Sequence, residues 1–308
     1  MDVVAELLAA ALRIATPLLF AALGGILSER AGVFAVGLEG MMLAGAFAGV
    51  IGTHTLGHAG LGLLASAAGG ALLAAVVAIA TVRCCADQMV TGLAVNILAL
   101  GLTSYLLRGL FGRGEAPIVR VTPLTQMPIP VLGDIPVVGP LLFRQPGLTY
   151  VGLALVVVMV AALQRTRAGL TLRAVGENPT AAFASGANPI RVRVLAVLGA
   201  GVLAGVGGAV LSLQQVGTFT DGMTNGRGYL ALAAIIVGRW SPGGALVGCL
   251  LFGAADALQL RVQGLRLPFS SYVIQMLPYV VSLAVLAGLG RSARLPAAIG
   301  IPFLRERR

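Results

Sequence analysis

The strongest constraint in this sequence is a succession of apolar runs, each long enough to cross a lipid bilayer as a helix. A spanning helix needs about 20 mostly apolar residues. Runs of this kind lie at 7–27, 33–52, 61–82, 89–107, 148–163, 194–213, 243–259 and 270–290. Because 58% of the residues are hydrophobic and only 10% are charged, the chain could not cover its surface in water. The sequence therefore predicts an all-α fold: a polytopic membrane helix bundle of about 8–9 transmembrane elements, some of them broken or short, in a single transmembrane domain spanning 1–308.

Two segments deviate from simple full-length spans. Residues 228–237 are apolar but too short to cross alone, and a turn-forming stretch at 238–244 follows them. We therefore interpret 214–240 as a return limb, in which a polar, glycine-rich stretch and a short helix together recross the membrane. In the next run, the polar residues of 256–261 are expected to mark a helix end.

The distribution of arginine sets the expected orientation, because loops on the inner side of a membrane carry more basic residues. Five arginines lie in the loop 164–193, and five more lie in the tail from 291 onward. Both segments can be inside only if an even number of crossings separates them, which requires 214–240 to cross. The C-terminus is then cytoplasmic, the N-terminus external and 108–148 an external loop. Its seven prolines exclude a regular helix, so this loop is either an ordered cap that docks a partner or a flexible connector.

All 21 basic residues are arginine, and the chain has no lysine. Without a P-loop, Schiff-base or kinase lysine, any ATP chemistry must come from another chain, so we expect neither enzyme activity nor a cofactor. No metal site is expected, because the cysteines lack CxxC spacing and the two histidines have no acidic neighbour in sequence. Placed on this topology, the net charge of +10 indicates orientation and partner docking, and no nucleic acid is expected as a partner.

Polar side chains cost a few kcal/mol at membrane depth, so they usually face a cavity or a partner. Our candidates for a substrate pathway are Glu39, Gln88, Thr91, Asn96, Asp221 and Asn225. Around Glu39, closely spaced glycines indicate a broken helix beside a water-filled path, and the amide of Asn96 suits an uncharged polar solute. The alternatives are a tight cytoplasmic turn at Glu39, hydrogen bonds at Asn96 that only join helices, and a simple loop at Asp221.

The inner loop contains the signals of a short capped helix. Asn178 fits an N-cap, and Pro179 fits the first helical turn. Residues 181–184, all alanine or phenylalanine, then predict a short helix that ends at Gly186. Such a helix, flanked by arginine on the inner face, is suited to docking against a cytoplasmic partner.

The segment 172–189, with its Arg-Ala-Val-Gly-x-Asn-Pro-x-Ala-Ala pattern, also resembles the coupling loop of permease subunits in the ATP-binding-cassette (ABC) importer family for simple sugars, nucleosides and branched-chain amino acids. Three further stretches, 29–42, 88–96 and 226–240, resemble the nucleoside branch of this family. The resemblance implies a nucleoside permease in the bacterial cell (inner) membrane. The implied ATPase-coupling residues are Gly176, Glu177, Asn178, Pro179, Ala181, Ala182 and Gly186. The implied partners are a cytoplasmic ABC ATPase, a second permease subunit, an external solute-binding lipoprotein, membrane lipid and a small-molecule solute.

The chain departs from the family pattern at 34–37, where family members more often carry an Asn-Ile-Gly type sequence, and this weakens a substrate role for that turn. Within the family, simple sugars or branched-chain amino acids are the alternative solutes. An ion-gradient-driven secondary transporter would need a titratable group in its pathway, for which Glu39, Asp221 and Asp256 are the candidates. A membrane scaffold without a solute path would use the polar clusters only to join helices.

Overall fold

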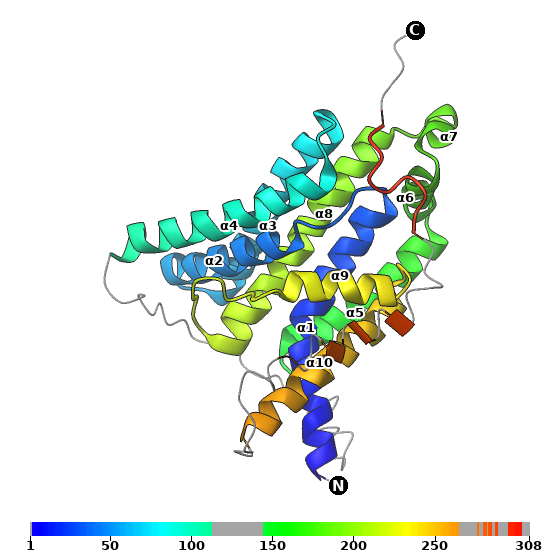
Figure 1. The fold of residues 1–308 in the computed structure, drawn as a ribbon. Coiled ribbons are helices and arrows are strands. Elements are labelled where there is room, and N and C mark those ends of the chain that lie inside the picture. The colour runs from blue at the N-terminus through cyan, green and yellow to red at the C-terminus, as the bar shows by residue number, and fades with distance from the viewer. Residues whose placement is uncertain are drawn as a thin grey trace.

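The computed structural model describes residues 2–112, 144–264, 276, 280–281, 283–284, 287–288 and 295–303. Its helices are α1 (Asp2–Arg30), α2 (Leu38–Leu56), α3 (Ala59–Ala78), α4 (Gln88–Phe111), α5 (Gly147–Arg165), α6 (Arg167–Glu177), α7 (Pro179–Ala184), α8 (Pro189–Ala209), α9 (Arg227–Val237) and α10 (Pro242–Gly264). Two π-helical turns, η1 (Ile79–Arg83) and η4 (Val210–Val216), extend α3 and α8. Figure 1 shows the start of α1 at one end of this bundle and α6, α7 and the segment 295–303 at the other.

Among the described residues, six helices are long and apolar enough to cross a membrane. They are Glu6–Arg30, Ala59–Arg83, Gln88–Leu110, Gly147–Arg165, Pro189–Val216 and Pro242–Gly264. This confirms the predicted polytopic all-α bundle and makes the chain a multi-pass membrane protein. Most of the predicted external loop and of the last predicted span, 270–290, lies outside the described residues.

One boundary prediction was wrong. The polar residues of 256–261 do not end a helix, because α10 continues through them to Gly264. Polar side chains alone do not stop a helix, and glycine is the residue that commonly does. The polar cluster therefore lies inside α10 and does not mark its end.

Glycines bring α2, α3 and α8 into backbone contact at the centre of the bundle. A Cβ atom added to Gly45 would lie 2.3 Å from the Cα of Gly205, and one added to Gly70 would lie 2.1 Å from the carbonyl oxygen of Gly201. No side chain fits at such distances, so the backbones themselves make the contact, as is typical of helices in lipid. Helix α1 packs against α8 in the same way, since a Cβ at Gly24 would lie 2.7 Å from the carbonyl oxygen of Ala200. We call α1, α2, α3 and α8 the glycine-packed core.

An irregular segment, 31–37, separates α1 from α2, as the sequence predicted. Gly32 has φ +89°, a left-handed conformation that favours glycine. The Ser28 hydroxyl donates to the carbonyl of Val33 at 2.8 Å, which folds the chain back over the end of α1. The break therefore has a defined conformation and lies next to the core.

The segment 214–240, interpreted from the sequence as a return limb, contacts α1 at two positions. Near its start, the Gln215 side chain donates to the carbonyl of Arg13 at 2.8 Å. At its end, the Arg30 side chain donates to the carbonyl of Trp240 at 2.9 Å. These two positions on α1 are separated by about 25 Å at 1.5 Å per helical residue. The two contacts therefore span a length of α1 comparable to the roughly 30 Å thickness of a bilayer's hydrocarbon core, and between them the chain forms turns first and then the short helix α9.

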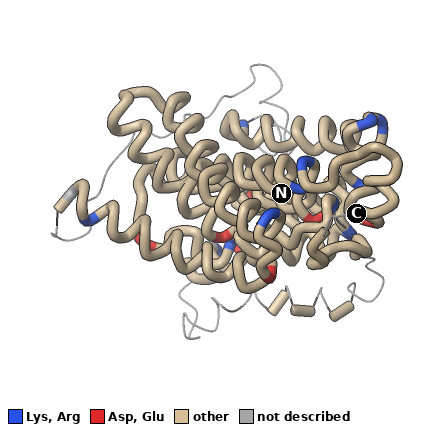
Figure 2. The backbone as a smooth tube through the Cα atoms, turned by 90° about the horizontal axis from the view of Figure 1, so that it is seen from above, with Lys and Arg blue, Asp and Glu red and all other residues tan. Residues whose placement is uncertain are grey.

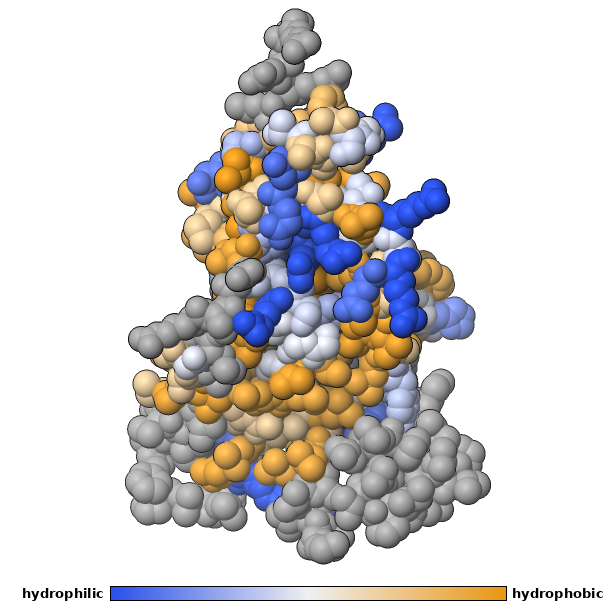
Figure 3. Space-filling model, turned by 90° about the vertical axis from the view of Figure 1, so that its right-hand side faces the viewer, coloured by the Kyte–Doolittle hydropathy of each residue, from blue (hydrophilic) through white to orange (hydrophobic). Residues whose placement is uncertain are grey.

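Charged residues are sparse along the helices. Seen from above in Figure 2, most of the backbone tube carries no charge. On the face shown in Figure 3, a hydrophilic patch lies toward the α6–α7 end, above a broad apolar band. An apolar band bordered by basic residues is what a protein in lipid presents at the membrane surface.

Candidate functional site

Two side chains of α4 hold the irregular segment between α1 and α2 in place. The Gln88 carbonyl oxygen accepts the backbone N–H of Phe34 at 2.7 Å. The amide of Asn96 accepts the N–H of Gly40 at 2.8 Å and donates to the carbonyl of Val36 at 3.0 Å. A broken helix leaves such backbone groups without helical partners, which is costly at membrane depth. Helix α4 therefore supplies hydrogen bonds that the break removes.

Glu39 joins the first turn of α2 to the beginning of α9. Its two carboxylate oxygens accept the N–H groups of Gly226, at 2.8 Å, and Gly228, at 2.6 Å. The first N–H groups of a helix have no partner within it, and a helix N-terminus favours negative charge. Glu39 thus caps α9 from another helix. Gly228 permits this approach, because a Cβ there would lie 2.5 Å from the Cα of Glu39.

Further polar contacts join α4 to the segment that leads into α9. The Asn96 amide also donates to the hydroxyl of Tyr229 at 2.9 Å. The Ser104 hydroxyl donates to Asp221 at 2.9 Å, and the Arg108 guanidinium lies 3.7 Å from the other oxygen of Asp221. We call this row of side chains the polar stripe. Its members are the contacting residues Asn96, Ser104, Arg108, Asp221 and Tyr229, together with Thr220 and Asn225, which are exposed on the same segment as Asp221.

The polar stripe is open on the surface of the chain. The side chains of Arg108 and Asp221 are 68% and 40% exposed, and Tyr229 is 43% exposed. Lipid tails cannot satisfy these groups, so they require a water-filled path or a protein partner. The charged groups are already engaged, because Asp221 pairs with Arg108 and Glu39 binds the N-terminus of α9. The exposed groups that remain are amides, hydroxyls and a phenol, which match a neutral polar solute.

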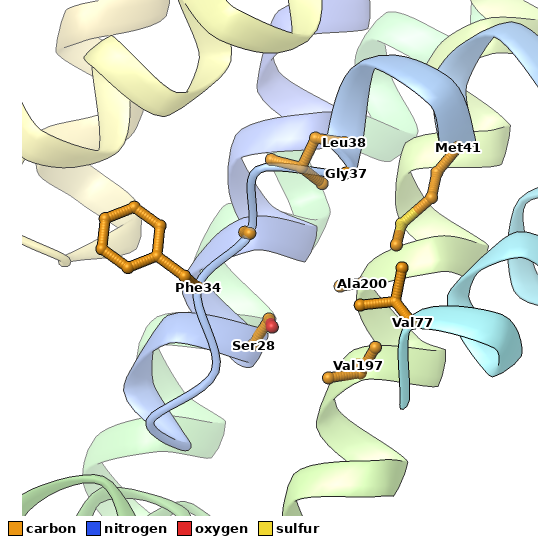
Figure 4. A pocket seen from close by; sticks show the side chains of 9 residues that line it. Ser28, Phe34, Gly37, Leu38, Met41, Val77, Val197 and Ala200 are labelled. Carbon is orange, nitrogen blue, oxygen red and sulfur yellow. The ribbon is translucent and has the colours of Figure 1, made fainter. Parts of the chain in front are cut away.

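A small pocket beneath the irregular segment is unsuited to such a solute. It is lined by Ser28, Phe34, Ala35, Gly37, Leu38, Met41, Val77, Val197 and Ala200. Figure 4 shows Met41 and Val77 pointing toward one another across it. Among these lining residues only Ser28 carries a hydroxyl, and that hydroxyl already donates within the turn. The pocket therefore offers little for recognising polar groups.

The connection between α5 and α8 folds into the short helices α6 and α7. The Asn178 side chain accepts the N–H of Ala181 at 2.9 Å, which confirms the predicted N-cap. Gly186 has φ +92° just after α7, as expected for a glycine that ends a helix. Helix α6 ends against α1, because a Cβ at Gly176 would lie 2.0 Å from the carbonyl oxygen of Arg30. The predicted coupling residues thus lie on an element in direct contact with the core.

The structure separates the predicted pathway residues into groups. Asn96, Asp221 and Asn225 belong to the polar stripe. The carboxylate of Glu39 and the carbonyl oxygen of Gln88 bind backbone groups of neighbouring segments. Thr91 differs from these residues, because its hydroxyl donates to the carbonyl of Asp87 within its own helix at 2.6 Å.

Two residues of this region were not singled out from sequence. Tyr229 could have been noticed as an aromatic residue with a polar tip at the start of a short apolar helix. Arg193 was counted only as an orientation charge, yet it is 2% exposed. Nothing in the local sequence separates it from the exposed Arg191.

Together, several apolar spans, a broken helix, a return limb and an open polar stripe define a membrane transport protein. A family model described as "Branched-chain amino acid transport system / permease component" matches residues 7–291. The chain belongs to this family of permease components.

Several relatives align over most of the chain, and three of them share 37–40% of their aligned residues with it. The guanosine ABC transporter permease protein NupQ of Bacillus subtilis is 37% identical over 305 residues, covering 96% of this chain and 95% of that protein. The nucleoside ABC transporter permease protein NupC of Lactococcus lactis subsp. cremoris is 39% identical over 303 residues, covering 95% and 94%. A Haloferax volcanii protein provisionally named as a glucose ABC transporter permease, TsgC13, is 40% identical over 271 residues, covering 87% and 80%. The family assignment inferred from the four sequence stretches is confirmed.

Proposed function

We propose that this chain is the permease subunit of an ATP-driven importer and forms its translocation pathway for nucleosides. The observation that carries this proposal is the nearly full-length similarity to a guanosine and a nucleoside permease. The polar stripe supports it, because neutral donors and acceptors suit the sugar hydroxyls and base edges of a nucleoside. Tyr229 and Tyr105, which is 75% exposed on α4, offer rings on which a base can stack, worth about 1–3 kcal/mol per base.

The second element of the proposal is the division of labour among subunits. A chain without lysine cannot provide a P-loop, so a separate cytoplasmic ABC ATPase supplies the energy and docks on α6 and α7. A second permease subunit faces the polar stripe, so the pathway lies between the two chains. An external solute-binding lipoprotein delivers the solute. The α6–α7 end is then cytoplasmic and the N-terminus external, in the bacterial cell membrane.

The mechanism follows from how these parts are joined. When ATP binding moves α7, α6 moves with it and displaces the end of α1, because Gly176 of α6 packs against Arg30. The irregular segment 31–37 begins at this point. Gln88 and Asn96 hold that segment from α4, and Glu39 holds the start of α9. A shift of α1 against α4 therefore alters the polar stripe and exposes the pathway to one side of the membrane or the other.

The test is purification of the tagged chain from native membranes, identification of its partners by mass spectrometry, and reconstitution of the complex in liposomes. Labelled guanosine is expected to accumulate only with ATP and the binding protein. Excess unlabelled adenosine should compete, whereas glucose and leucine should not. If glucose alone competes, the substrate is a sugar and not a nucleoside. If uptake is driven by an ion gradient without ATP, the chain is not part of an ATP-driven importer.

A further inference from the structure

The segment 295–303 is hydrogen-bonded to the end of α6, although the two are more than 100 residues apart in the sequence. The backbone N–H of Ala298 donates to the carbonyl of Gly176 at 2.9 Å. The N–H of Ala297 donates to the carboxylate of Glu177 at 3.4 Å. These contacts lie at the junction between α6 and α7, so the segment reaches the element proposed to receive the ATPase.

The same segment also touches α7 itself. The rings of Phe183 and Phe303 lie 5.8 Å apart between centroids, at an interplanar angle of 51°. Aromatic pairs at this separation attract one another beyond the area they bury. Phe183 is 40% exposed, so the pair sits at the surface on which α7 would meet a partner.

A buried arginine ties this segment to the core. The guanidinium of Arg193, near the start of α8, donates to the carbonyl of Ile301 at 2.8 Å and to that of Ala298 at 3.3 Å. Its Nε donates to the carbonyl of Ala31 at 3.1 Å. One side chain thus binds the segment 295–303 and the first residue after α1 at the same time.

The chemistry of arginine explains why this residue fits the position. Among the described residues no carboxylate forms an ion pair with Arg193, and three carbonyl oxygens accept hydrogen bonds from its buried guanidinium. A planar guanidinium has five N–H donors in a fixed fork and can bind three carbonyls in different directions. Lysine concentrates its donors at one point, and glutamine offers two N–H bonds at most.

The residue that Arg193 holds leads directly to the pathway. Ala31 follows the end of α1, where the Glu29 carboxylate accepts the N–H of Ala35 at 3.3 Å and the indole N–H of Trp240. Beyond Ala35 come the groups bound by Asn96, the first member of the polar stripe. A continuous series of contacts therefore runs from α7 through 295–303 and Arg193 to the polar stripe.

We propose that the segment 295–303 is a brace that makes α6 and α7 move together with the end of α1, and that Arg193 is its positioning residue. This inference rests on the proposed function, because it assigns the brace to the coupling of ATP hydrolysis to transport. Without the brace, α7 still docks on the ATPase, but its movement is only partly transmitted to the irregular segment 31–37.

The test compares R193Q with wild type in the purified, reconstituted complex. Three quantities are measured: ATPase co-purified per permease, ATP hydrolysed, and solute imported per ATP. We expect co-purification and hydrolysis close to wild type, and a fall of about five- to tenfold in solute imported per ATP, within the range of known coupling effects. In R193K the solute imported per ATP should fall less, because lysine keeps the positive charge and some of the N–H donors.

R191Q is the matched control. Arg191 lies on the same helix and is exposed, so the same chemical change there should leave the ratio unchanged. F303A removes the aromatic contact without touching the buried charge and should lower the ratio about twofold. Hydrogen exchange of 295–303 gives a readout independent of activity and should speed up in R193Q.

The outcomes separate the brace from the proposed function. If R193Q lowers hydrolysis and import in equal proportion, or leaves import per ATP and exchange at 295–303 unchanged, the brace is wrong although the importer stands. If the wild-type chain purifies without an ATPase and transports without ATP, the proposed function is overturned and the brace is overturned with it.

Discussion

The glycine-packed core and the polar stripe both hold helices together in lipid, but they do so by opposite means. In the core, backbones touch, and positions such as Gly45 and Gly205 leave no room for a side chain. At and beside the polar stripe, α4 and α9 are held chiefly by side chains that bind backbone groups, Asn96 within the stripe and Glu39 next to it, although the backbones also approach closely at Gly228. Of the α4 glycines, Gly92 lies close to Val36, whereas Gly101 and Gly109 have nothing within 4 Å of an added Cβ.

This difference indicates which part of the molecule can rearrange. A joint of interlocked backbones resists small displacements, because packed interiors are bistable and not continuously deformable. A joint made of hydrogen bonds can exchange its partners for water or for a solute at little cost. We infer that the glycine-packed core is the frame of the permease and that the polar stripe is the side that changes during transport.

The largest effect on stability is expected when a side chain is introduced into the glycine-packed core. A Cβ at Gly205 would lie 2.3 Å from the carbonyl oxygen of Ser66, so G205L must force α3 and α8 apart. We expect a loss of about 4 kcal/mol or more in the free energy of unfolding, seen as little folded protein in detergent by fluorescence-detected gel filtration.

G101L is the control for this prediction. Because the surface around Gly101 is open and glycine is unfavourable in a helix interior, G101L should fold as well as wild type, or gain up to about 1 kcal/mol. If both variants fold equally well, close backbone packing does not define the frame.

The next largest effect is expected at the cap of α9. E39A leaves the N–H groups of Gly226 and Gly228 without the charged acceptor that now binds both. Hydrogen bonds to charged groups contribute about 1.5–3 kcal/mol each, so we expect local destabilisation of about 3 kcal/mol. Hydrogen exchange should speed up at 226–230 and remain unchanged in α3. E39Q should lie between E39A and wild type, and unchanged exchange in E39A would show that α9 does not need this cap.

Features encoded by neighbouring residues could be predicted from the sequence. The glycines around 32–40 indicated the break after α1, and Asn178 with Pro179 indicated the start of α7. In each case the responsible residues are adjacent to the feature, so the local pattern carries the information. The expected helix end at 256–261 was wrong, because polar side chains do not by themselves stop a helix and α10 continues through them.

The contacts that build the site could not be predicted in this way. Glu39, Gln88, Asn96 and Arg193 all bind backbone groups of distant segments. Backbone N–H and carbonyl groups are the same at every residue, so nothing in the sequence identifies which of them a polar side chain will meet. Only the packing of the core fixes these partners, so the sequence could not show that Glu39 caps α9.

A smaller effect on folding, but a specific one on transport, is expected at Asn96. N96L removes the hydrogen bonds to Gly40, Val36 and Tyr229, and we expect a loss of about 2 kcal/mol in stability. N96D keeps an acceptor for Gly40 and loses both donors. If Asn96 only joins helices, uptake in both variants should follow the amount of folded protein. If it also lines the pathway, guanosine uptake per folded complex should fall further, with KM rising more than Vmax falls.

The smallest effect is expected at the exposed end of the polar stripe. Arg108 and Asp221 are largely open to their surroundings and 3.7 Å apart, and exposed ion pairs contribute about 0–1 kcal/mol. D221N preserves the shape of the side chain and should change the melting temperature by no more than about 2 °C. It should nevertheless leave Arg108 as an unpaired cation beside the pathway, so a phosphorylated nucleoside should compete with guanosine better than it does in wild type. Raising the salt concentration should reduce this gain, because screening weakens attraction between exposed charges. Equal competition in D221N and wild type at low salt would mean that the solute does not pass this end of the stripe, and the region that rearranges would then be confined to Asn96, Tyr229 and the start of α9.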